Sequence, residues 1–220
     1  TAGAGTDFGN YVLPTSVSGT GTISAAALTG TLVDQSKTYD GTEDALIAAG
    51  DITLDGFAGT ESATANQVSV LGTYLDVNAV ATANVADATI VSAALAGTEF
   101  TAGAGTDFGN YVLPTSVSGT GTISAAALTG TLAPQSKTYD GSDAATIAVG
   151  DITLSGFAGS EGATSKAVSG TYLDANAVAT ANVADATTVT SAALAATDFT
   201  AGTGTDFGNY VLPTSVSGTG

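Results

Sequence analysis

The chain has 220 residues and a formal net charge of −17, because 20 acidic residues outnumber three basic ones. It contains no His and no Cys, so the commonest general base, the commonest transition-metal ligand and the thiol nucleophile are excluded. Three lysines cannot form the basic patch that nucleic acids require, and no segment approaches the roughly 18 apolar residues of a membrane span. The sequence therefore predicts a protein that is not an enzyme, has no nucleic-acid partner and does not insert into membranes.

Short segments rich in Val, Ile, Thr and Tyr alternate with Gly-rich turns along the chain. The first, Thr22–Leu32, predicts a long strand, although its alanines give Ser24–Leu28 some helix propensity. After the turn at Gly50-Asp51, Ile52–Leu54 predicts the next strand.

Further strands are predicted at Gln67–Leu71, Thr89–Ser92 and Asn110–Leu113, the last of which is ended by Pro114. Asp76–Ala88 is alanine-rich, but it carries Val, Thr and Asn and lacks an apolar stripe of period 3.6. We therefore predict a strand or an extended edge there instead of a helix. Short strands separated by Gly-rich turns are typical of an all-β sandwich or barrel.

A long internal repeat organises the sequence. Residues 1–32 recur unchanged at 101–132, and the first 21 residues return from Thr200 with one substitution. A period of about 100 residues suits an array of small domains, whereas solenoid repeats have roughly 20 to 50 residues. With the VSGTGT segment as the seam, residues 1–20 are predicted to be the C-terminal strand segment of a preceding repeat. Residues 21–120 and 121–220 are each predicted to be a β-sandwich repeat. We expect tandem immunoglobulin-like sandwiches in an extended array that belongs to a longer chain.

The aromatic residues fall at equivalent positions of the repeats. One interpretation is a stacking platform for sugars. We favour the other, in which large rings anchor a core that otherwise consists of small aliphatic side chains. The exposure of Tyr39, Tyr74 and Tyr111 distinguishes the two, because a binding platform needs exposed rings.

Three motifs carry a family resemblance. Lys37–Thr42 (KTYDGT) and Lys137–Ser142 (KTYDGS) resemble the signature of the YDG-type repeat domain, and Gly50–Leu54 and Gly109–Leu113 resemble its second and closing landmarks. The resemblance spans essentially the whole unit in both copies. It implies an extracellular β-domain of a stalk or fibre, as in large secreted bacterial proteins similar to filamentous haemagglutinins and biofilm adhesins, and it implies no enzymatic activity. The repeats here are more alike than is usual in such stalks, which also fits a polymer built from the repeat itself.

Calcium is the candidate cofactor, because many acidic extracellular repeats use carboxylates as ligands for hard cations. The segment from Asp40 to Asp44 has oxygen ligands at alternating positions, but the second copy replaces Asp44 by Ala144. The Asp-x-Asn pairs further along are also common in plain Asx turns, which we favour. The candidate ligands are Asp40, Asp44, Asp76, Asn78, Asp174 and Asn176.

Lys37 and Lys137 occupy equivalent positions and are nearly the only cations of the chain. One hypothesis is an intramolecular Lys–Asn isopeptide bond, as in some Gram-positive surface domains, with Asn110 or Asn209 as the partner. The alternative, which we favour, is a solvated lysine or one paired with a nearby Asp. Intact mass distinguishes them, because each isopeptide bond releases one ammonia.

The favoured functional hypothesis is a non-enzymatic structural repeat of a bacterial extracellular fibre or adhesin stalk at the cell surface. Its expected partners are the neighbouring repeats and other copies of the chain in a fibre. In a variant of this hypothesis, residues 1–20 form a strand shared with the adjoining unit, which joins the repeats by β-augmentation. The alternative is an adhesive module that binds glycans or other surface ligands.

Overall fold

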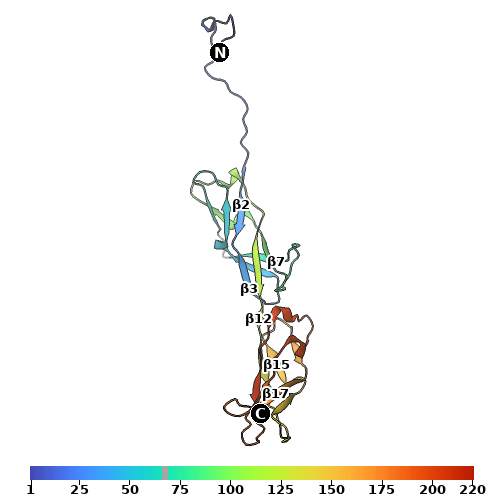
Figure 1. Ribbon diagram of the computed structural model, residues 1–220. Coiled ribbons are helices and arrows are strands. Elements are labelled where there is room, and N and C mark those ends of the chain that lie inside the picture. The colour runs from blue at the N-terminus through green and yellow to red at the C-terminus, as the bar shows by residue number, and fades with distance from the viewer. Residues whose placement is uncertain (66–68) are drawn as a thin grey trace.

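The computed structural model describes residues 1–65 and 69–220 and consists mostly of short strands (Figure 1). The molecule is elongated, and its two termini lie at opposite ends (Figure 1). The strands are β1 (Ala26–Ala27), β2 (Thr29–Leu32), β3 (Gln35–Thr38), β4 (Asp44–Ala48), β5 (Ile52–Asp55), β6 (Ala63–Ala65), β7 (Ser69–Leu75), β8 (Ile90–Ala94), β9 (Phe100–Ala102), β10 (Tyr111–Val112), β11 (Ser116–Ser124), β12 (Ala126–Ala127), β13 (Thr129–Leu132), β14 (Ala144–Ile147), β15 (Ile152–Ser155), β16 (Ala163–Ser165), β17 (Val168–Leu173), β18 (Thr188–Ser191), β19 (Phe199–Ala201), β20 (Tyr210–Val211) and β21 (Ser217–Thr219). The 3₁₀ helices are η1 (Phe8–Asn10), η2 (Ala49–Asp51), η3 (Gly97–Glu99), η4 (Phe108–Asn110), η5 (Ala196–Asp198) and η6 (Phe207–Asn209).

Strand pairing divides the elements into a first strand set, β1 to β11, and a second strand set, β12 to β21. The first set has a five-stranded sheet in the order β3-β11-β8-β7-β4, with the pairs β2–β5, β6–β9 and β1–β10 beside it. The second set repeats this plan with the sheet β14-β17-β18-β21 and the pairs β13–β15, β16–β19 and β12–β20. Within the described residues, no strand of one set pairs with a strand of the other.

Alternating burial along the strands builds the core. In β4 the buried residues are Ala45 and Ile47, and in β5 they are Ile52 and Leu54, while their neighbours in each strand are exposed. This period of two is the pattern expected of strands with one face on a core. The chain is therefore all-β, as predicted. No helix in the described ranges is long and apolar enough to cross a bilayer.

Strand β11 pairs with two different neighbours. Residues 116–120 pair antiparallel with β8, and residues 121–124 pair parallel with β3. The predicted boundary between repeats, at residues 120 and 121, thus lies inside strand β11. In the second strand set, β21 pairs with β18, while Gln135–Thr138, the counterpart of β3, forms no strand.

The long strand predicted for Thr22–Leu32 is wrong. Residues 22–25 lie outside strands, and Leu28 interrupts the remainder between β1 and β2. Leu28 is buried and its N–H donates to the carbonyl of Val112 (2.9 Å), after which the chain changes its partner from β10 to β5. Sequence alternation does not reveal such a change of partner, because side chains keep alternating across it.

The strand or extended edge predicted for Asp76–Ala88 is also wrong. This segment forms turns, with one isolated bridge between Leu75 and Ala81. The carboxylate of Asp76 accepts the N–H groups of Asn78 and Val80 (2.8 Å each). A short polar side chain that bonds its own backbone replaces a partner strand, and this favours a turn.

The other predicted strands correspond to β5, β8 and β10. The prediction at Gln67–Leu71 lies partly outside the described residues, and its described part, residues 69–71, begins β7. Residues 1–20 contain η1 and no strand, and all of residues 1–27 are exposed. The strand predicted to be shared through residues 1–20 is therefore not formed within this chain.

Candidate functional site

The lysine of the KTYDG motif lies at the centre of a cluster of oxygen atoms. Lys37 Nζ donates to Asp40 Oδ1 (2.7 Å), to the carbonyl and the hydroxyl of Thr42 (2.7 and 3.0 Å), and to the carbonyl of Asp44 (3.0 Å). The same ammonium lies 5.3 Å from the centre of the buried Tyr74 ring, which is within cation–π range. Burial alone would raise the pKa of Asp40, but the hydrogen bonds from Lys37 and Thr42 outweigh it and hold that pKa below its usual value.

The second strand set repeats this cluster around Lys137. Its Nζ donates to Asp140 Oδ1 (2.8 Å), to the carbonyl and hydroxyl of Ser142 (2.7 and 3.1 Å) and to the carbonyl of Ala144 (2.8 Å). The hydrogen bond from Lys137 is the main cause that lowers the pKa of Asp140 to about 2. Because Ala144 offers the same carbonyl as Asp44, the replacement of that carboxylate leaves the cluster intact.

These contacts bear on the calcium and isopeptide hypotheses. In the KTYDG loops a lysine ammonium occupies the oxygen cluster that was the candidate calcium site. The described residues contain no group of three or more acidic side chains placed to hold a metal. Asp76 and Asp174 cap turns through the N–H groups two and four residues later, and these bonds lower the pKa of both carboxyls, with the bond from the fourth residue contributing most. Calcium at the six candidate ligands stays a prediction.

The structure does not bring the proposed isopeptide partners together. Among the described residues, the ammonium groups of Lys37 and Lys137 bond to oxygens of their own loops and to no asparagine. Asn110 is exposed, whereas Asn209 is buried and serves a different contact. The arrangement supports the lysine–aspartate pairing.

The contact between the two strand sets is the feature that sequence reasoning missed. The hydroxyl of Tyr39 donates to Glu161 Oε1 (2.6 Å), and the hydroxyl of Tyr210 donates to Glu161 Oε2 (2.8 Å). The rings of Tyr39 and Tyr210 meet edge to face, with 5.2 Å between their centres. Burial, the bond to Glu161 and the charge of that carboxylate together raise the pKa of Tyr39 well above its usual range.

Asn209 completes this contact. Its Oδ1 accepts the N–H of Val85 (2.9 Å), and its Nδ2 donates to Asn84 Oδ1 (3.2 Å). Asn84 and Val85 belong to the turn region before β8, while η6 positions Asn209. We call Tyr39, Asn84 and Val85 the donor face, and Glu161, Asn209 and Tyr210 the acceptor face.

Each strand set carries both faces, but only one pair is joined within the part of the chain that the structure describes. The donor face of the second set consists of Tyr139, Asn182 and Val183, all of them exposed. Tyr139 is 65 % exposed, compared with 8 % for Tyr39. The acceptor face of the first set consists of Glu61, Asn110 and Tyr111, and there too the tyrosine hydroxyl donates to the glutamate.

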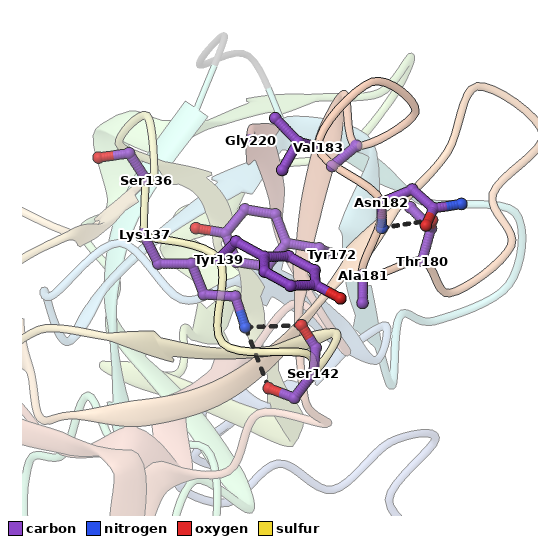
Figure 2. A pocket seen from close by; sticks show the side chains of 11 residues that line it. Ser136, Lys137, Tyr139, Ser142, Tyr172, Thr180, Ala181, Asn182, Val183 and Gly220 are labelled. Atoms are coloured by element: carbon purple, nitrogen blue, oxygen red, sulfur yellow. Dashed lines mark hydrogen bonds between the residues drawn. The ribbon is translucent and has the colours of Figure 1, made fainter.

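A cavity of about 160 Å³ adjoins the unjoined donor face (Figure 2). Its lining includes Ser136, Lys137, Tyr139 and Gly220. Figure 2 shows Lys137 hydrogen-bonded to Ser142 in this cavity, and Asn182 near Thr180. Sequence reasoning named Tyr39 and Asn209 for other roles, and their recurrence did not distinguish them from the core residues that recur in the same way.

No protein-family profile, curated protein or solved structure matches the chain.

Proposed function

We propose that the chain is a non-enzymatic structural part of a secreted bacterial fibre or adhesin stalk, built from tandem immunoglobulin-like β-sandwich repeats of the YDG type. Its role is mechanical: each repeat adds length, and the contact between repeats fixes their relative orientation. The location is extracellular, at the cell surface. Neighbouring repeats of the same chain are its first partners.

The contact between donor and acceptor faces carries this proposal. A carboxylate that accepts two tyrosine hydroxyls, together with a buried asparagine that bonds a turn of the other strand set, specifies one orientation. In addition, Ala125 alone separates β11 from β12, so the connection has little slack. A flexible linker between domains would instead leave both faces exposed.

Ring burial supports the structural role over the glycan-binding alternative. Tyr39, Tyr74 and Tyr111 are all buried, and the ring of Phe57 packs edge to face against Tyr111. A platform that stacks on sugars would need several exposed rings on one face. These three rings are instead used in the core and in the contact between the strand sets.

A distance measurement tests the fixed orientation. The chain has no native cysteine, so spin labels can be attached at Leu46→Cys and Val149→Cys, two exposed positions in different strand sets. We expect double electron–electron resonance, with the labelled chain diluted into unlabelled chain, to give a narrow distribution of distances. Asn209→Ala should broaden it, because the bonds to Val85 and Asn84 are lost.

Asn110→Ala is the matched control, because Asn110 is the equivalent, exposed residue on the unjoined acceptor face. It should leave the distribution narrow. A broad distribution in the unsubstituted chain would contradict the proposed rigid spacer.

A further inference from the structure

We propose that Tyr39 and Tyr210 are a site of oxidative cross-linking: one-electron oxidation couples their rings into a dityrosine that joins the two strand sets covalently. The co-reactant is a one-electron oxidant, such as a peroxidase with hydrogen peroxide. The inference goes beyond the proposed function, because it concerns a bond that forms only when an oxidant acts on the protein. It depends on the contact between the donor face and the acceptor face alone.

The composition of the chain directs oxidation to tyrosine. Cysteine, methionine, tryptophan and histidine are all absent from the sequence, whereas seven tyrosines are present. Sulfur side chains would otherwise react with an oxidant before it reached a phenol. The side chains that give up an electron most readily in this protein are therefore its tyrosines.

Tyr39 and Tyr210 are placed to couple. Their ring centres lie 5.2 Å apart with 83° between the ring planes, so carbon atoms of the two rings are in contact. Both hydroxyls bond to the carboxylate of Glu161, which brings the ring edges beside the hydroxyls towards each other. Those edges carry the ortho carbons, at which two tyrosyl radicals combine. The rings of a dityrosine are twisted about the bond that joins them, so the angle between the planes is no obstacle.

No other two tyrosine rings are in contact among the described residues. Tyr111, the counterpart of Tyr210, packs against Phe57 and donates to Glu61, without a second phenol beside it. Two rings held in contact couple in an effectively unimolecular step, whereas separate tyrosines first have to meet by diffusion. Coupling within one molecule should therefore join Tyr39 to Tyr210.

Glu161 is positioned to take up the phenolic protons. Removal of an electron from a phenol makes its hydroxyl strongly acidic, so the proton leaves together with the electron. Oε1 of Glu161 lies 2.6 Å from the hydroxyl of Tyr39, and Oε2 lies 2.8 Å from that of Tyr210. Glu161 is partly exposed, so it can pass one proton to solvent before it accepts the next. One carboxylate thus serves as the base for both rings.

The reaction balances with hydrogen peroxide as the oxidant. Each tyrosine loses one electron and its phenolic proton, and the two radicals form a carbon–carbon bond between their ortho carbons. The hydrogen on each of these carbons then moves to the phenolic oxygen, which restores both phenols. The protein loses two hydrogen atoms in total, and one molecule of hydrogen peroxide is reduced to two molecules of water.

Tryptic mapping of the oxidised chain tests the proposal. The probe is photo-oxidation with ruthenium tris-bipyridine and persulfate, because electron transfer to it needs no direct contact with the buried rings. The only basic residues are Lys37, Lys137 and Lys166, so trypsin separates residues 38–137, which contain Tyr39, from residues 167–220, which contain Tyr210. After oxidation of dilute chain, we expect these two peptides to stay joined, two hydrogen atoms lighter than their sum, and to show dityrosine fluorescence.

Conservative variants identify the coupled rings. Tyr210→Phe and Tyr39→Phe should each abolish the joined peptide, because phenylalanine forms no phenoxyl radical. Tyr111→Phe is the matched control: it removes the equivalent tyrosine of the first strand set and should leave the joined peptide in place.

Glu161→Gln tests the base. Glutamine keeps the hydrogen-bonding positions but cannot take up a proton, so the joined peptide should form about tenfold or more slowly. A narrow distance distribution between the spin labels in this variant would show that the orientation of the strand sets is kept. An unchanged rate would overturn the role assigned to Glu161.

Two results would overturn the cross-link itself: separate peptides after oxidation of the unsubstituted chain, or an equal yield of joined peptide in Tyr210→Phe. Separate peptides together with a narrow distance distribution would reject the cross-link and leave the proposed structural function in place. A broad distribution in the unsubstituted chain before oxidation would count against that function itself.

Discussion

Lys137 and Asp140 form an ion pair at the molecular surface, and hydrogen bonds of both side chains to Ser142 fix its geometry. The separation of Nζ and Oδ1 is 2.8 Å, and the Asp140 carboxylate also accepts the N–H and the hydroxyl of Ser142 (3.0 Å each). A surface ion pair alone contributes little to stability. The observable that reports on this cluster is the pKa of Asp140.

Replacing Lys137 by Met should return that pKa from about 2 towards the ordinary value of 3.8, because the donor that lowers it most is removed. A lowered carboxyl pKa stabilises the fold above pH 3.8, and this contribution is lost as the pH falls towards 2. Carboxyl ¹³C shifts measured by NMR against pH give the value directly.

Lys166→Met provides the control, since Lys166 Nζ donates to the carbonyl of Thr197 and not to Asp140. It should leave the titration of Asp140 unchanged. If the Lys137 variant also titrates near 2, the assigned cause of the shift is wrong.

For individual residues, the sequence identified the KTYDG loop but did not show which groups its lysine contacts. The KTYDG motif marked Lys37 and Asp40 together, and the favoured pairing with a nearby aspartate is the arrangement found. The calcium interpretation arose because carboxylates and hydroxyls suit a metal ion and an ammonium equally well. The position of Nζ shows the lysine pairing, while calcium at Asp40 and Asp44 stays a prediction.

Among the elements, β7 depends on the absence of a side chain at Gly72. A Cβ built there would lie 2.7 Å from Ile47 Cδ1 and 2.9 Å from the carbonyl oxygen of Ser92 in β8. The second distance involves backbone of the neighbouring strand, which cannot move without disturbing the sheet. Gly170 has the same environment in β17, with a carbonyl oxygen at 2.7 Å.

Gly72→Ala should therefore lower the free energy of unfolding by about 1 to 3 kcal/mol, the range for overpacked cores. Urea denaturation followed by circular dichroism measures the change. Gly50→Ala adds the same methyl group where no atom lies within 4 Å, so it should change stability much less. Equal effects of the two substitutions would show that packing at Gly72 is not the cause.

The sequence predicted strands well where a strand keeps the same partners along its whole length, as in β5 and β8. It failed at Leu28, where the chain changes partner, and after Asp76, where a carboxylate organises a turn. Both failures have one physical origin, because periodicity records which side chains are buried and does not record which backbone bonds which. The contact between the strand sets was missed for a related reason, since Tyr39 and Tyr139 have the same sequence context but different neighbours in space.

For the whole molecule, the Tyr39–Glu161 hydrogen bond links stability to alkaline pH. The pKa of Tyr39 is raised in the folded state, so above pH 10 the unfolded chain loses a proton that the folded chain keeps. The unfolded state then binds fewer protons, and stability must fall as the pH rises.

Tyr39→Phe should reduce the slope of the free energy of unfolding against pH, by an amount that corresponds to at most one proton. At neutral pH it should cost about 1.5 to 3 kcal/mol, the range for a hydrogen bond to a charged group. Urea unfolding of both chains between pH 8 and 11.5 measures the two effects. Tyr139→Phe makes the same substitution at the exposed counterpart and should leave the stability at neutral pH unchanged. Identical pH slopes for Tyr39→Phe and the unsubstituted chain would contradict the assignment.

The parallel pairing of β3 with β11 also determines how the molecule bears tension. β3 lies near the start of the first strand set and β11 at its end, and the two run in the same direction. A pull on the two ends therefore draws these strands past each other, and their hydrogen bonds are loaded together in shear instead of opening one after another.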